Sequence, residues 1–200
     1  MSALTASVDS TLLVFALKEE AQNLFDGFHT IYTGVGKVNA AYQLMLNLAH
    51  WKEKRGAYPE LVLNVGSAGS SLFGRGSVVN CTQFIQRDMD ATAFGHTRYA
   101  TPYEDVAPVL SAGLRCESYP QGVCGSGDNF ATDGTMRGWN VVDMEAYALA
   151  KVCVGQNVPF CCLKYISDGA DDQAAATWGD ALTATAQALQ KAVRSIVVHR

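Results

Sequence analysis

Residues 139–153 read WNVVDMEAYALAKVC, and this stretch decides the fold class. The two valines at 141–142 form a short run typical of a buried strand, and an apolar segment of helical length, residues 145–156, follows at once. A strand that leads directly into a helix is the basic unit of an α/β domain. Asp143 and Glu145 lie at this junction, and a buried carboxylate needs a partner or it becomes neutral.

The same alternation extends along the chain in both directions. Strands are predicted over residues 11–16, 29–33, 61–65, 77–86, 122–124, 140–143 and 160–167. Helices are predicted over residues 19–25, 37–54, 145–156 and 180–198. Three prolines make residues 97–121 the least regular part. The pattern indicates an α/β sheet covered by helices on both faces, with residues 1–10 as a flexible N-terminus and residues 11–200 as a single domain.

Composition narrows the function classes. The 200 residues are 48% hydrophobic and 17% charged, which is typical of one globular domain that buries roughly 70% of the unfolded chain's surface. Fifteen basic and 19 acidic residues give a net charge of −4, and no cationic cluster is longer than residues 52–55. These values disfavour nucleic acid as a partner, because binding to phosphates requires an excess of basic charge.

The six cysteines show no CxxC pair and no Cys/His ligand spacing. No structural zinc or other metal is expected, and reduced cysteines favour a cytoplasmic location. The N-terminal residues lack the features of a signal peptide, and no apolar run approaches the roughly 18 residues of a membrane span. The sequence therefore predicts a soluble protein that has no membrane partner.

Glycines and carboxylates follow the predicted strands, where ligands bind in open α/β sheets. These sites are residues 18–20 (KEE), 33–41 (TGVGKVNAA), 66–70 (GSAGS), 143–145 (DME) and 167–171 (SDGAD). Each has a purely structural interpretation as well. Glu19 or Glu20 could favour a helix N-terminus through the macrodipole, and Ser67, Asp168 and the acids at 143–145 could be N-caps. Acids at several strand ends together are harder to explain by capping alone.

An acidic rim with small residues suits a neutral or cationic ligand that carries several hydroxyl groups. One carboxylate can accept hydrogen bonds from two sugar hydroxyls, and a second can polarise a water molecule for attack on an electron-deficient carbon. Cleavage of glycosidic bonds uses such pairs. The residues therefore indicate sugar or nucleoside chemistry without identifying the substrate.

Seven motifs, in order, resemble the purine nucleoside phosphorylase and nucleosidase superfamily, and within it the methylthioadenosine/S-adenosylhomocysteine nucleosidases. The motifs are FALKEEA (15–21), TGVGKVNAA (33–41), NVGSAG (64–69), RDMDATAFG (87–95), SGDNF (126–130), VVDMEAYALAKVC (141–153) and VPFCCLKYISDGAD (158–171). The resemblance implies a three-layer α/β/α sandwich with a central mixed, twisted sheet. It also implies a homodimer without a cofactor that hydrolyses 5′-methylthioadenosine or S-adenosylhomocysteine and releases adenine.

The resemblance also assigns roles to individual residues. Glu20 corresponds to the carboxylate that activates the attacking water, and Asp168 to the general acid that protonates the purine at N7. Glu145 corresponds to the carboxylate that binds the ribose hydroxyls, with Met144 beneath the ribose. The remaining substrate-binding positions are the apolar Leu17, Ser67 at the water site, Phe130 stacked on the purine, the backbone near Ala131, and Ser167.

Some positions depart from the family pattern. Lys164 replaces an arginine near the water site, and His96 replaces a tyrosine in a segment, with Phe94, that would reach the partner subunit's pocket. Asn64 and the stretch 18–20 stand where phosphorylases carry arginines, which favours water over phosphate as the nucleophile. The chain is also short after the first helix, between residues 97 and 121, and between residues 130 and 140.

Three alternatives remain open from the sequence. The substrate could be another modified nucleoside such as futalosine. The reaction could be a phosphate-dependent phosphorolysis. The chain could also be an inactive homologue that binds or stores a nucleoside, although the joint presence of Glu20, Glu145 and Asp168 argues against that alternative.

Overall fold

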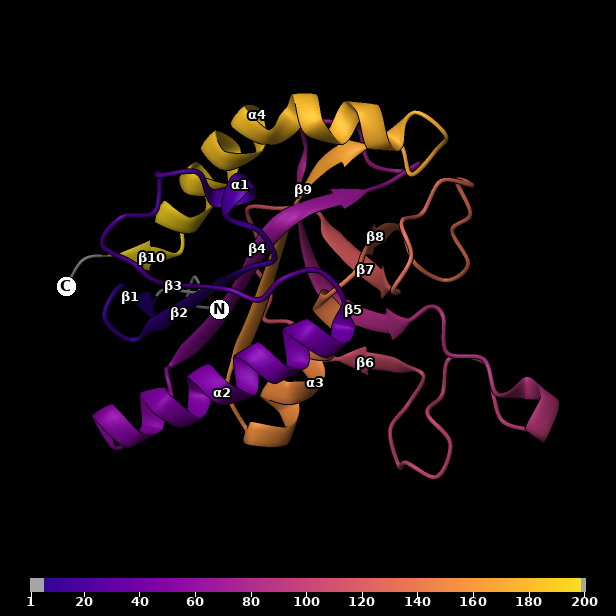
Figure 1. Ribbon diagram of the computed structural model, residues 1–200, viewed down its shortest axis with the longest axis horizontal. Helices are drawn as coiled ribbons and strands as arrows, with labels where there is room; N and C mark the ends of the chain where they lie inside the picture. The colour runs from indigo at the N-terminus through magenta and orange to yellow at the C-terminus, as the bar shows by residue number, and fades with distance from the viewer. Residues whose placement is uncertain (1–5, 199–200) are drawn as a thin grey trace.

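A central mixed sheet separates two layers of helices in the computed structural model, which describes residues 6–198 (Figure 1). Within these residues the sheet contains β2 (Thr11–Phe15), β3 (His29–Tyr32), β4 (Leu61–Gly69), β5 (Val78–Gln86), β6 (Val109–Ser111), β7 (Gln121–Ser126), β8 (Val141–Asp143) and β9 (Phe160–Asp168). The helices are α1 (Lys18–Ala21), α2 (Lys37–Arg55), α3 (Ala146–Gln156) and α4 (Ala174–Arg194), with a 3-10 turn η1 (Thr92–Phe94). The predicted three-layer α/β/α architecture is confirmed.

The central strands pair in a closed circuit. β4 pairs with β9, β9 with β5, β5 with β7, β7 with β8, and β8 again with β4. β2 and β3 extend the sheet from β4, and β6 extends it from β5. Gly69 at the end of β4 is opposite both Val142 of β8 and Asp168 of β9. The ends of three strands therefore meet at one point, and their side chains can share one site.

Side chains of β4 point to the two faces of the sheet and pack in the core on both sides of it. Val62 and Ala68 pack in the cluster that includes residues of α2 and α3, whereas Leu63 and Val65 pack in the cluster that includes residues of α1 and α4. All nine residues of β9 are buried, so both faces of this strand are covered, and its polar residues Lys164, Ser167 and Asp168 are buried as well. Figure 1 shows α1 and α4 on one face of the sheet and α2 and α3 on the other.

Some elements differ from the predictions: β4 continues to Gly69 instead of ending at residue 65, α1 ends at Ala21 instead of residue 25, and β6 was not predicted. Further differences lie at the chain ends. Helix α4 begins six residues before the predicted start at residue 180, because Gly179 continues the helix instead of interrupting it. The helix ends at Arg194. The terminal residues predicted as helix instead form β10 (Val197–Val198), which pairs with β1 (Ala6–Ser7). The flexible N-terminus expected for residues 1–10 stays a prediction, and residues 1–5 lie outside the described residues.

Asn80 on β5 connects the core of the sheet to the segment that follows β6. Its side chain is fully buried, and its amide donates to the carbonyls of Leu114 (3.2 Å) and Cys162 (3.1 Å). Its carbonyl oxygen accepts the backbone N–H of Cys116 at 2.8 Å. One side chain thus satisfies three backbone groups, one on β9 and two in the segment that follows β6.

We expect Asn80→Ala to lower the free energy of unfolding by about 2 kcal/mol, because it leaves buried polar groups without partners. Urea denaturation monitored by tryptophan fluorescence would measure the change. Asn47→Ala is the matched control, since the half-buried Asn47 makes one hydrogen bond, to Gln43 of its own helix. Equal losses in the two variants would contradict the role given to Asn80.

Candidate functional site

A cavity of about 320 Å³ opens where β4, β8 and β9 meet. Its lining residues come from strand ends, from the loops that follow them and from helices on one face of the sheet. They are Ala16, Leu17, Glu20, Val35, Ser67, Ala68, Gly69, Arg87, Asn129, Phe130, Ala131, Val142, Asp143, Met144, Glu145, Ser167, Asp168, Ala175 and Trp178. The carboxylates of Glu20, Glu145 and Asp168 are all buried.

The short helix α1 directs Glu20 against the backbone of β4. One carboxylate oxygen of Glu20 accepts the backbone N–H of Ser67 at 2.8 Å and its hydroxyl at 2.6 Å. The indole N–H of Trp178, on α4, donates to the same Ser67 hydroxyl at 2.8 Å. This approach is close because residue 66 is a glycine: a Cβ there would lie 3.2 Å from the Glu20 carboxylate. Ser67 lies within β4, so its interpretation as a helix N-cap is wrong.

Asp168 lies at the end of β9, against Gly69. Its carboxylate accepts the hydroxyl of Ser167 at 2.7 Å and the backbone N–H of Ala170 at 2.9 Å. A Cβ at residue 69 would lie 2.6 Å from an Asp168 oxygen, so the position requires glycine. Helix α4 begins only at Ala174, so Asp168 does not cap it.

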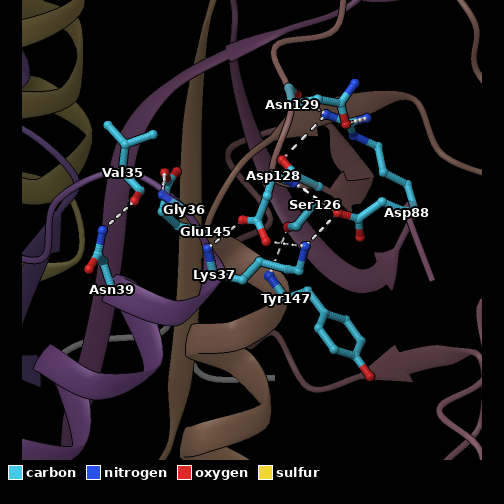
Figure 2. A network of polar contacts seen from close by, with 12 residues as sticks. Val35, Gly36, Lys37, Asn39, Asp88, Ser126, Asp128, Asn129, Glu145 and Tyr147 are labelled. Atoms are coloured by element: carbon cyan, nitrogen blue, oxygen red, sulfur yellow. Dashed lines mark hydrogen bonds and ion pairs between the residues drawn. The ribbon is translucent and has the colours of Figure 1, made fainter.

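Glu145 precedes helix α3 and faces the glycine turn after β3. Its carboxylate accepts the backbone N–H of Gly36 at 2.9 Å, as Figure 2 shows. Burial, together with the nearby charge of Asp143, raises the pKa of Glu145 to about 7. In the free protein the hydrogen-bond donors around Glu145 are therefore too few to keep its carboxyl group fully ionised at neutral pH.

Asp143 and Lys164 form an ion pair of 2.9 Å with both side chains almost fully buried. Burial opposes the charged form of Asp143, but Lys164 and the hydroxyl of Ser126 hold its pKa below the ordinary value. Burial likewise opposes the charge on Lys164, but Asp143 holds the pKa of the ammonium well above its ordinary value. Asp143 also accepts the backbone N–H of Ala146, the first residue of α3, at 2.9 Å. It therefore satisfies one free donor of this helix, although Glu145 occupies the N-cap position.

The cavity brings together most of the predicted site residues, which come from distant parts of the sequence. These are Leu17, Glu20, Ser67, Phe130, Ala131, Met144, Glu145, Ser167 and Asp168. Lys164, expected near the water site, does not line the cavity, because its ammonium is held by Asp143. Phe94 is 86% exposed on η1, which extends away from the sheet (Figure 1), and His96 contacts the ring of Tyr103.

Several lining residues were not singled out from the sequence. They are Ala16, Val35, Ala68, Gly69, Arg87, Asn129, Val142, Ala175 and Trp178. Val35, Arg87 and Asn129 lie inside the quoted motifs, so their place in those motifs was an available signal. Trp178 carried no such signal, because Gly179 and the predicted start of the last helix at residue 180 placed it in a loop. Its position follows only from the true extent of α4.

Three comparisons identify proteins that this chain is similar to. The family described as the Phosphorylase superfamily matches residues 29–199. A 5′-methylthioadenosine/S-adenosylhomocysteine nucleosidase from an Exiguobacterium species is 34% identical over 163 residues, which cover 71% of this chain and 67% of the relative. The Helicobacter pylori nucleosidase of the same name, solved with butyl-thio-DADMe-Immucillin-A, superposes with a TM-score of 0.77 at 23% identity and covers 93% of this chain and 96% of its own. Native futalosine hydrolase from Helicobacter pylori gives the same TM-score and coverages at 24% identity.

The pKa of Glu145 predicts how the stability of the free protein changes with pH. The unfolded side chain loses its proton near 4.5 and the folded one near 7, so the folded state binds more protons between these values. The free energy of unfolding should therefore fall as the pH rises through this window, with about 3 kcal/mol contributed by Glu145. Urea denaturation across the window should show a smaller fall for Glu145→Gln. Parallel curves for the two proteins would contradict this assignment.

Proposed function

Because this chain belongs to the Phosphorylase superfamily, we propose that its cavity hydrolyses the N-glycosidic bond of a purine nucleoside. The proposed substrates are 5′-methylthioadenosine and S-adenosylhomocysteine, from which the reaction would release adenine. The observation that carries this proposal is the convergence of Glu20, Glu145 and Asp168 on one cavity. The Exiguobacterium relative, which is named for the same two substrates, supports the choice.

In the proposed reaction, a water molecule binds beside Glu20 and the Ser67 hydroxyl. Glu20 takes a proton from the water as its oxygen attacks C1′ of the ribose. The bond between C1′ and N9 breaks, its electron pair goes to the purine, and Asp168 donates a proton to N7. The buried carboxyl group of Glu20 lies against Gly66 and that of Asp168 lies against Gly69, which suits these two separate proton transfers.

The remaining lining residues would hold the substrate. Phe130 would stack on the purine, and the backbone near Ala131 would bond to its edge. Glu145 would accept hydrogen bonds from the ribose hydroxyls, with Met144 beneath the sugar. These new donors, added to Gly36, would favour the charged form of Glu145, which in turn stabilises a ribosyl cation.

Water is the proposed nucleophile in preference to phosphate. Among the described lining residues the acids are Glu20, Asp143, Glu145 and Asp168, and Arg87 is the basic residue. Asn64, at a position where an arginine would favour phosphate, is buried and its amide donates to the carbonyl of Val14 at 3.0 Å. A phosphate dianion near Glu20 would therefore face carboxylates without a pair of guanidinium groups.

A second candidate substrate is futalosine. The observation that favours it is the similarity in fold to futalosine hydrolase of Helicobacter pylori. The same residues would act, and the leaving base would be hypoxanthine instead of adenine. Release of adenine or of hypoxanthine from a panel of nucleosides would separate the two substrates.

We also propose a homodimer in the cytoplasm. Helix α2 presents an exposed apolar face formed by Val38, Tyr42, Met45 and Leu46, which would be covered by a second copy of the chain. Among the described residues, the six cysteines are free and buried, which suits a reducing compartment. No helix in the described part of the chain is both long and apolar enough to cross a membrane.

Glu20→Gln and Asp168→Asn should each lower kcat for adenine release from 5′-methylthioadenosine by at least about 100-fold, because each removes a proton-transfer group. The neighbouring Glu19, which is exposed, provides the matched control Glu19→Gln. A coupled assay for free adenine, with and without added phosphate, would measure the rates. Full activity in either site variant, or a rate that depends on phosphate, would contradict the proposed hydrolysis.

Tyr42→Glu should shift the protein from dimer towards monomer in sedimentation velocity, because it places a charge in the proposed interface. Ala184→Glu is the control, since Ala184 is exposed on α4 in the opposite helical layer. A monomeric wild-type protein, or equal behaviour of the two variants, would count against the dimer.

A further inference from the structure

A second cavity, of about 370 Å³, lies directly beside the first. Five residues line both cavities: Arg87, Asn129, Phe130, Ala131 and Val142. The carboxylates of Glu20, Glu145 and Asp168 do not line the second one. The two cavities are therefore in contact at the end where Phe130 and Ala131 would hold the purine, away from the ribose and water positions.

In the described lining of the second cavity, more arginines than aspartates are left without an ion pair. Its lining includes three arginines and three aspartates: Arg87, Arg98, Arg137, Asp88, Asp90 and Asp133. Arg98 pairs with Asp90 at 2.6 Å, and Asp88 pairs with Lys37 at 2.6 Å (Figure 2). Among the described residues, Arg87 and Arg137 form no ion pair, and of the three acids only Asp133 is left without one. Arg87 donates hydrogen bonds to Asn129, and hydrogen bonds from Thr135, followed by the charge of Arg137, lower the pKa of Asp133.

Two buried donors in this lining also lack acceptors. The Nε of Arg87 and the indole N–H of Trp139 have no hydrogen-bond partner among the described residues. Trp139 is only 8% exposed, and a buried donor without an acceptor costs about 1–3 kcal/mol. Guanidinium and indole groups carry no acceptors, so a ligand that matches this lining must bring its own.

We propose that the second cavity binds an anionic substituent carried on the six-membered ring of the substrate's purine. This inference rests on the proposed function, in which Asp168 faces N7 of the five-membered ring and the backbone near Ala131 faces the six-membered ring. A substituent on the six-membered ring, such as a carboxyalkyl group on the exocyclic nitrogen, would pass between Phe130 and Arg87 into the second cavity. There its carboxylate would accept hydrogen bonds from the guanidinium of Arg137 and from the Nε of Arg87, whose terminal nitrogens already donate to Asn129.

The base of the nucleoside, and not its 5′ end, is the part of the substrate that would face the second cavity. Leu17, which the resemblance places beside the substrate, and Val35 line the first cavity but not the second. Phe130 is 44% exposed and lies in both linings. It belongs to residues 127–140, which form no helix or strand. Four of the five residues shared by the two cavities therefore lie outside the strands, and the fifth, Val142, belongs to β8.

Three substrates and two variants test the proposal. The substrates are 5′-methylthioadenosine, its N6-(2-carboxyethyl) derivative and the N6-(2-carbamoylethyl) derivative, which has nearly the same shape without the charge. In the wild-type protein we expect kcat/KM for the carboxylate derivative to exceed that for the amide by about tenfold. Arg137→Gln should remove most of this preference, whereas Arg115→Gln, an exposed arginine outside both cavities, should keep it.

The outcomes separate this inference from the proposed function. If 5′-methylthioadenosine is cleaved but the carboxylate derivative is no better than the amide, the inference is overturned and the proposed function stands. A preference that survives Arg137→Gln would also overturn it. If no nucleoside is cleaved, calorimetric titration with the two derivatives tests the cavity directly: tighter binding of the carboxylate, lost in Arg137→Gln, supports the inference, and equal binding overturns it.

Discussion

The whole site depends on two positions of β4 that have no side chain. Gly66 and Gly69 let the carboxylates of Glu20 and Asp168 lie against the backbone of a strand that is paired on both sides. Any larger residue at 69 would collide with the Asp168 carboxylate. The acids can be buried because the strand supplies space, and because the N–H and hydroxyl groups of Ser67, Ser167 and Ala170 supply donors.

The acids in this region differ in how their charge is compensated. Asp143 has a full positive charge beside it, from Lys164, and it accepts the backbone N–H of Ala146 at the start of helix α3. Glu145, two residues later, has the backbone N–H of Gly36 and a repelling neighbour in Asp143, so its pKa rises. One buried acid is thus fixed as part of the framework, and the other is left with capacity for additional donors. A ligand with a pair of hydroxyl groups provides them.

Much of this arrangement follows from local sequence, and the rest depends on contacts between distant segments. The stretches that contain Glu20, Ser67 and Asp168 could be located because each follows or ends an apolar run, and strand ends collect at one edge of an α/β sheet. The choice of Glu20 over Glu19 came from the family resemblance. The ion pair between Lys164 and Asp143 could not be predicted from the sequence, because it depends on how β8 and β9 are placed around β4. The second cavity was equally hidden, because irregular segments on either side of β7 form its lining.

The closed circuit of strands is fixed by backbone pairing, whereas the segments that connect the strands are not. Because β4, β5, β7, β8 and β9 are paired around a ring, the strands β4, β8 and β9, which end at the site, have partners on both sides and a fixed register. The irregular segments 88–108 and 127–140 cross the rim and carry few of these contacts. Such segments can be shortened or exchanged while the acids stay in register. The protein is therefore a suitable scaffold for loop grafting, in which new base preferences are installed on a fixed hydrolytic centre.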